Sequence, residues 1–236
     1  MATLDLQEQE QLDNLKAFWA KWGTLISAVT TLALLAFAGW NGWNTWQRSQ
    51  GEKAGIAFEG VEQAVEAKDV EKASRLLAEM QTRFASATYT SQASLMVAQA
   101  APADKALPLL QWAASKGQPQ DLRDLAQLRL AALHMEAKRD TEANAALDAV
   151  KSPAFAALVA DRRGDLALLK NDKVKAAEQF KLAYLAMEAD LPYRRLIEAK
   201  LVSVGVDPTS LAKKAEASCW LARGFVSSAP SSRSAC

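Results

Sequence analysis

The stretch between Lys21 and Arg48 places the strongest constraint on this chain, because its 26 positions carry no charged side chain. A helix of about 20 apolar residues crosses the hydrocarbon core of a bilayer. A buried core helix and a cleaved signal peptide are the two alternatives. The length of the run favours a membrane span over a core helix, and we predict a transmembrane anchor over residues 22–46.

Tryptophans at both ends of the run support a retained anchor in contact with membrane lipid. Indole rings prefer the headgroup zone, where the ring is buried and the N–H stays hydrated. Five of the seven tryptophans lie there: Trp19, Trp22, Trp40, Trp43 and Trp46. Ala36-Phe37-Ala38 before Gly39 resembles a signal-peptidase site. However, the preceding region is acidic rather than basic, and three tryptophans would then follow the cleavage site.

The flanking charges leave the orientation of the anchor open. Lys16 and Lys21 precede the run, and Arg48 and Lys53 follow it. The positive-inside count is therefore a tie. The simplest topology places a short tail, residues 1–21, in the cytoplasm and translocates the larger C-terminal part.

One face of the predicted span is rich in small side chains, spaced four and then three residues apart. It consists of Thr24, Ala28, Thr31, Leu35, Ala38 and Gly42. Small residues allow another helix to approach closely in a membrane. The alternative is that any span rich in alanine and threonine shows such a stripe by chance.

The remainder of the chain predicts an all-α fold. Alanine, the best helix former, makes up roughly a fifth of the chain. Apolar residues recur at three and four, which indicates amphipathic helices. Breaks at proline, glycine and Asn-Asp divide the chain into helices predicted at 53–68 (continuing the anchor helix), 69–84, 88–100, 103–115, 118–138, 141–150, 153–170, 173–188 and 192–204.

A self-match at a shift of about 33 residues relates the segments 161–183 and 128–150. Paired helices with a period near 34 are typical of tetratricopeptide repeats. The repeat pattern places small residues where the two helices of a hairpin approach and a large one toward the next repeat. The later unit meets it with Gly164, Ala176, Phe180 and Ala183; the earlier unit meets it loosely with Ala131, Ala143, Leu147 and Val150. We predict a tetratricopeptide-like array over residues 47–204, with an irregular hairpin array as the alternative.

Residues 205–236 lose the repeat and end in a serine-rich stretch, which predicts a disordered tail. The tail holds Cys219 and Cys236. These two cysteines could pair in an oxidising compartment or remain free.

The sequence offers little for catalysis or for ligand chemistry. A net charge of +1 argues against a nucleic-acid partner. A single histidine, His134, and two cysteines exclude a zinc site of the usual spacing. No phosphate-binding loop or nucleophile elbow is present. Carboxylate pairs such as Asp161 and Asp165 are interpreted as surface groups beside basic neighbours. We therefore predict a non-enzyme with no cofactor, no metal and no small-molecule substrate.

Three stretches together resemble a known family, the ancillary subunits of the SecYEG translocon in Gram-negative bacteria. They are the start at Leu6–Leu12 with Leu15, Lys16 and Trp19, then the anchor with its tryptophans, and then Ala157–Asp165 running on to Asn171–Lys173 and Ala176-Ala177. The resemblance covers about residues 1–204. The chain departs from the family after Gly205, because such proteins usually end near residue 204.

The resemblance implies a single-pass inner-membrane protein with a cytoplasmic N-terminus and a periplasmic helical-repeat domain. It also implies contact with the SecYEG translocon and with a membrane-anchored periplasmic chaperone of the peptidyl-prolyl isomerase type. The implied role is to pass exported proteins to periplasmic chaperones. A link to stress-response regulation is a further implication, and no family binding residue is specific enough to be carried over.

Three hypotheses of function follow. The first is an adaptor, in which stacked hairpins present a concave surface to another protein. The second is a chaperone that binds unfolded chains itself through an exposed apolar groove, for which Trp112, Tyr184 and Tyr193 are the large candidates. The third is a structural scaffold of the envelope.

Overall fold

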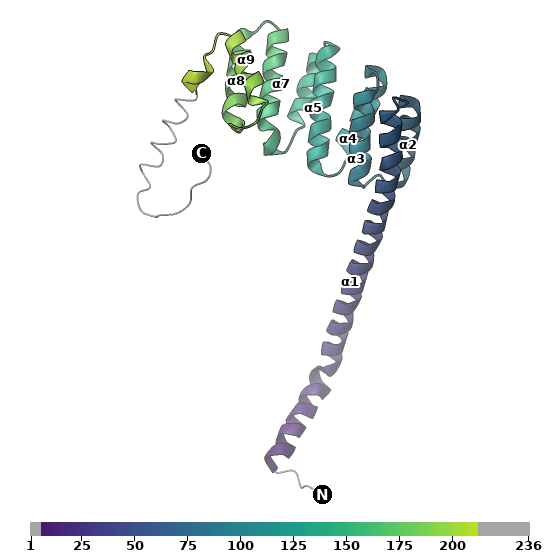
Figure 1. The fold of residues 1–236 in the computed structure, drawn as a ribbon. Helices are drawn as coiled ribbons and strands as arrows, with labels where there is room; N and C mark the ends of the chain where they lie inside the picture. The colour runs from purple at the N-terminus through teal and green to yellow at the C-terminus, as the bar shows by residue number, and fades with distance from the viewer. Residues whose placement is uncertain (1–5, 212–236) are drawn as a thin grey trace, which may run out of the picture. The chain divides into compact units, whose positions relative to one another are not determined.

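The computed structural model describes the backbone of residues 6–211 and the side chains of residues 16–211. This part of the chain is helical and contains no strand (Figure 1). The all-α prediction is confirmed, and most helix ends lie within two residues of their expected positions. The helices are α1 (Leu6–Glu66), α2 (Val70–Arg83), α3 (Thr88–Ala100), α4 (Ala103–Lys116), α5 (Gln120–Glu136), α6 (Asp140–Asp148), η1 (Pro153–Phe155), α7 (Ala156–Leu169), α8 (Lys173–Ala186) and α9 (Arg194–Ser203).

The chain divides into two compact units between Lys53 and Ala54, and α1 contributes to both. The prediction that the anchor helix continues beyond the apolar run is confirmed, since α1 is one helix of 61 residues. Its segment from Lys16 onward is long and apolar enough to cross a membrane. None of its most apolar window is buried within the protein, which argues against the core-helix alternative.

Four hydroxyl groups in the apolar part of α1 donate hydrogen bonds to carbonyl groups of the helix itself. Thr30 and Thr31 each donate a hydrogen bond to the carbonyl four residues earlier, at 2.8 Å in both cases. Thr45 donates in the same way to the Asn41 carbonyl, and Ser27 donates to the Thr24 carbonyl three residues earlier. A bilayer offers no water to an unpaired hydroxyl, so this internal pairing makes these residues compatible with lipid.

The same turn closes three of the hairpins. A residue in the left-handed conformation follows the first helix, and the next N–H donates to the carbonyl five positions before it. This is the Schellman arrangement, which satisfies the last carbonyls of a helix. The left-handed residues are Lys68, Lys138 and Asn171, with φ of 57°, 57° and 58°. The bonds are Asp69 to Ala64, Arg139 to His134 and Asp172 to Ala167, at 2.8–2.9 Å.

The second helix of each hairpin repeats one packing pattern. A small residue is followed four positions later by a large one. A third apolar residue lies three positions after the large one. The four sets are Ala73, Leu77 and Met80; Ala106, Leu110 and Ala113; Ala143, Leu147 and Val150; and Ala176, Phe180 and Ala183. All are buried except Val150, which is half-buried. The repeat seen in sequence at two units therefore extends over four.

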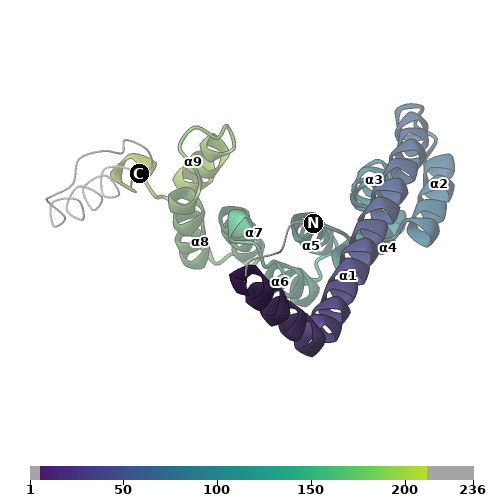
Figure 2. The same cartoon turned by 90° about the horizontal axis from the view of Figure 1, so that it is seen from below.

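Within the domain the hairpins stack in a row. Figure 2 shows the first helices α3, α5 and α7, followed by α9, along one side, with α4, α6 and α8 along the other. Packing continues past α9, because Val206 and Leu211 contact the core around Phe180. Gly205, with φ of 80°, repeats the hairpin turn, and the Asp207 carboxylate accepts the N–H of Thr209 at the start of a helical turn at 208–211. The rest of the predicted tail, including Cys219 and Cys236, lies outside the described residues.

Candidate partner-binding groove and its supporting charges

The four residues predicted to pack the last repeat lie together between α7 and α8. Ala176, Phe180 and Ala183 have no exposed surface. Gly164 of α7 faces the Phe180 ring so closely that a Cβ there would lie within 3.0 Å of the ring carbons. A glycine at this point therefore permits the close approach of the two helices.

Two hollows adjoin on the side of the domain formed by the first helices. The larger, of about 680 Å³, lies among α3, α4, α5 and α7. The second, of about 420 Å³, lies between α5 and α7. They share Ala132, Glu136 and Arg162, so they form one continuous surface. We call it the inner groove.

Apolar residues make up most of the lining of the inner groove, although about half of the exposed surface of the larger hollow is polar. The larger hollow is lined by Gln99, Arg129, Glu136 and Arg162 and by small side chains and two leucines, which are Ala98, Ala101, Ala103, Ala106, Leu110, Ala132 and Leu133. The second is lined by Met135, Leu168 and Leu169, of which Leu169 is 61% exposed. A surface that is concave, apolar and provided with a few charged groups is typical of a binding site for another molecule.

Arg129 and Arg162 occupy equivalent positions in the repeat, each two residues before the small residue of its first helix. Both line the larger hollow. The half-buried Arg129 donates to the Leu95 carbonyl of α3 at 2.8 Å, and burial lowers the pKa of its guanidinium below the usual value. Arg162 instead pairs with Asp165, one turn further along α7, at 3.2 Å.

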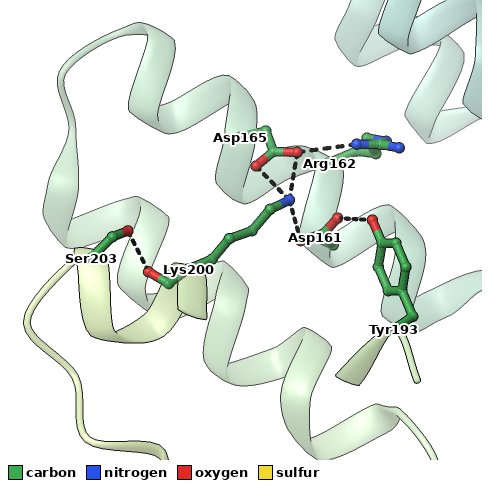
Figure 3. Close-up of polar contacts among 6 residues, drawn as sticks. All are labelled: Asp161, Arg162, Asp165, Tyr193, Lys200 and Ser203. Carbon is green, nitrogen blue, oxygen red and sulfur yellow. Dashed lines mark hydrogen bonds and ion pairs between the residues drawn. The ribbon is translucent and has the colours of Figure 1, made fainter. Parts of the chain in front are cut away.

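A buried charge cluster lies on the other flank of α7 and attaches α9 (Figure 3). The Lys200 amino group of α9 lies 2.7 Å from a carboxylate oxygen of both Asp161 and Asp165. The Tyr193 hydroxyl donates to the second oxygen of Asp161 at 2.8 Å. Asp161 has no exposed surface. The interpretation as an ordinary surface carboxylate is therefore wrong for Asp161, which α9 covers, whereas Asp165 stays partly exposed and pairs with its neighbour Arg162.

The cluster also connects α9 to the inner groove. Asp165 accepts from Lys200 on one side and from Arg162 on the other, so the orientation of Arg162 depends on α9 being in place. Burial, reinforced by the hydrogen bond to Asp161, raises the pKa of Tyr193 to about 12. Its hydroxyl therefore stays protonated and keeps donating at neutral pH.

A second buried carboxylate, Asp124 of α5, fixes a loop. It accepts the backbone N–H groups of Lys151 and Ser152 at 3.2 and 2.7 Å, and the Gln120 amide at 2.7 Å. These bonds hold the connection from α6 to η1 against α5. The burial of Asp124 is thus explained by its structural role in holding this loop.

The three large candidates for a chain-binding groove do not line it. Tyr184 is buried in the core with Phe180, and Trp112 packs against the core around Leu110. Tyr193 belongs to the α9 cluster. His134 is half-buried beside the start of α4, in a separate hollow with Ala103 and Leu107. Sequence reasoning missed Arg129 and Arg162, although their spacing of one repeat period was a signal that could have identified them.

The residues of the predicted anchor lie along α1. The five tryptophans are 45–69% exposed, and the Trp43 and Trp46 rings lie 5.2 Å apart. The predicted helix-contact face is likewise exposed in this chain at Thr24, Ala28, Thr31, Leu35, Ala38 and Gly42. At Gly42 an added Cβ would meet nothing within 4 Å.

Comparison with known proteins connects the anchor and the helical domain. A family model described as a tetratricopeptide repeat-like domain matches residues 16–206. The ancillary SecYEG translocon subunit of Neisseria gonorrhoeae (strain ATCC 700825 / FA 1090) is 28% identical over 204 residues, which are 84% of this chain and 98% of that protein. The protein of the same name from Escherichia coli (strain K12) is 31% identical over 173 residues, 70% of this chain and 82% of that protein. No solved structure matches the chain.

These matches confirm the predicted resemblance and the tetratricopeptide-like fold. The family model spans most of the chain, including the whole candidate membrane span and all four hairpins. The relatives cover nearly the same length. The protein is membrane-anchored, and it belongs to the family of ancillary SecYEG translocon subunits.

Proposed function

We propose that this protein is an adaptor at the SecYEG translocon, which passes exported proteins to periplasmic chaperones without catalysing a reaction itself. The proposed partners are the channel and a membrane-anchored chaperone of the peptidyl-prolyl isomerase type. The observation that carries the proposal is the inner groove, a concave surface of apolar and charged side chains in a chain that also has a membrane helix. Stacked helical hairpins present such surfaces to other proteins.

The proposed topology places residues 1–21 in the cytoplasm, the anchor in the inner membrane and the helical domain in the periplasm. The tryptophans then lie at the two lipid interfaces. The small face of α1, which includes Ala28 and Ala38, is proposed to contact a helix of the channel, since small residues permit close helix packing in lipid.

Site-specific cross-linking in intact membranes tests the adaptor proposal. A photoreactive residue replaces Glu136 in the groove or, as a control, the exposed Arg75 on α2. Cross-linked products are identified by mass. We expect chaperone products from position 136 and not from position 75. Identical products from both positions would contradict a role for the groove.

A detergent pull-down tests the anchor face. Ala28→Leu together with Ala38→Leu should reduce recovery of channel subunits while the protein stays in the membrane fraction. The control is Val29→Leu, which adds bulk to α1 away from the small face. Equal channel recovery from wild type and the double variant would reject this contact.

A second candidate, a chaperone that binds unfolded chains directly, is favoured by the exposed Leu169 in the second hollow. Direct binding would produce cross-links from position 136 to many exported proteins. The adaptor would instead produce a few discrete chaperone products.

A further inference from the structure

The larger hollow of the inner groove contains a cation that lacks an acidic partner. Arg129 makes one hydrogen bond, to the Leu95 carbonyl, although a guanidinium has five N–H donors. Among the described residues no carboxylate forms an ion pair with it. Its counterpart Arg162, one repeat later, pairs with Asp165. Even partial burial of a charge without a counter-ion is unfavourable, so the half-buried Arg129 is a ready site for an anion.

The surroundings of Arg129 restrict the kind of anion. The walls of the hollow are mostly alanine and leucine, and the adjoining hollow presents Met135, Leu168 and Leu169. A free inorganic anion would gain nothing from this apolar surface. A polypeptide that carries a carboxylate beside apolar side chains would use both. Glu136 also lines the groove, but it is exposed, where water screens its repulsion of an acidic ligand.

The length of the groove suggests how much chain it can hold. It crosses α3, α5 and α7, and packed helices lie about 8–10 Å apart. Three helices therefore span roughly 20 Å, which is about six residues of extended chain at about 3.3 Å each.

We propose that the inner groove binds a short extended segment of a partner polypeptide, with an aspartate or glutamate side chain of that segment on Arg129 and an apolar side chain in the second hollow. The inference deepens the adaptor proposal and rests on it. A guanidinium can hold a carboxylate through two parallel hydrogen bonds, which gives orientation as well as affinity. The groove should therefore prefer acidic-apolar segments over neutral or basic ones.

Fluorescence anisotropy with the full-length protein in detergent tests this preference. The probes are three labelled ten-residue peptides of alanine, serine and leucine, identical except for one central glutamate, glutamine or lysine. We expect the glutamate peptide to bind at least tenfold more tightly than the glutamine peptide, and the lysine peptide to bind most weakly. Equal binding of the glutamate and glutamine peptides by the wild-type protein would overturn the proposal.

Variants assign the preference to Arg129. Arg129→Gln should abolish it, whereas the control Arg75→Gln, an exposed cation on α2, should retain it. Ala132→Glu places a carboxylate one turn along α5 from Arg129 and within its reach. The new carboxylate should compete with the peptide for Arg129 and so also abolish the preference. Ala132→Glu therefore tests the role of Arg129 even if Arg129→Gln lowers the melting temperature. A preference that survives Ala132→Glu would refute the role of Arg129.

A parallel pull-down of channel subunits separates this inference from the adaptor proposal. Recovery of the channel without any preference for the acidic peptide would overturn the groove inference and leave the adaptor role in place. A preference for the acidic peptide without recovery of the channel would support the groove inference and contradict the adaptor role.

Discussion

At the scale of single residues, the most consequential group is Lys200, because it neutralises Asp161, a carboxylate with no contact with water. Ion pairs at the surface contribute little to stability, whereas removing one partner of a buried pair leaves an uncompensated charge. The exposed pair between Lys105 and Glu71 joins α2 and α4 at the same distance of 2.7 Å. The two pairs therefore differ in their contribution to stability because of their burial and not because of their distance.

Because the Lys200 pair is buried and the Lys105 pair is exposed, we expect Lys200→Met and Lys105→Met to differ strongly in their free energy of unfolding. Lys200→Met should lower the free energy of unfolding by about 3–5 kcal/mol, because Asp161 remains buried without its cation. Lys105→Met, which removes an exposed lysine, should leave it nearly unchanged. Urea unfolding of both variants in detergent, followed by circular dichroism, measures the difference. Similar unfolding midpoints would contradict the buried pair.

The raised pKa of Tyr193 predicts that the folded protein loses stability at alkaline pH. Its pKa in the folded protein is raised to about 12 by burial and by Asp161, above the ordinary value of 10.0. The folded state thus holds the hydroxyl proton more tightly than the unfolded state. The stability that this bond contributes is fully present below pH 10 and is lost as the pH rises from about 10 to about 12.

An absorbance titration at the tyrosinate band checks this value. The difference between wild type and Tyr193→Phe should show one tyrosine that ionises near pH 12. A difference curve centred near pH 10 would mean that the hydroxyl is exposed and that α9 is not held against α7.

At the scale of elements, the close approach of α7 and α8 depends on the absence of a side chain at Gly164. Replacing a helical glycine by alanine ordinarily stabilises a helix by about 0.5–1 kcal/mol. At Gly164 the new Cβ would lie within 3.0 Å of the Phe180 ring, and overpacking of a core costs about 1–3 kcal/mol. Phe180 is fully buried among core residues, so we expect the steric cost to exceed the gain.

A pair of glycine variants tests this balance. Gly164→Ala should lower the melting temperature. Gly60→Ala, in α1, should raise it or leave it unchanged, because an added Cβ there meets only Leu76 at an ordinary 3.7 Å. A thermal melt of each variant is sufficient. Stabilisation by Gly164→Ala would show that the two helices are not packed as described.

At the scale of the whole molecule, the proposed topology places the two ends of α1 on opposite sides of a membrane. The test uses a chain in which serine replaces Cys219 and Cys236, with a new cysteine at Gln7 or at the exposed Lys116. An impermeant thiol reagent on intact spheroplasts should label position 116 and not position 7. Labelling at position 7 alone would reverse the orientation.

The sequence by itself determined the membrane helix, the all-α class and the hairpin repeat, because each is a local or periodic property. The uncharged run needs no partner to be recognised. The repeat spacing also identified Ala176 and Phe180, since helix pairing imposes it on neighbouring residues.

Only the tertiary structure decided which charged residues are buried and which line the groove. Asp161 meets Tyr193 and Lys200 from 32 and 39 positions away, and Arg129 reaches Leu95 from 34 positions away. Separations of 32 and 34 positions are close to the repeat period, but that period does not tell which side chains meet, because their contact depends on how α9 docks and how the first helices align. A carboxylate beside arginines in sequence is ordinarily solvated; the packing of α9 over α7 makes Asp161 a buried counter-ion instead.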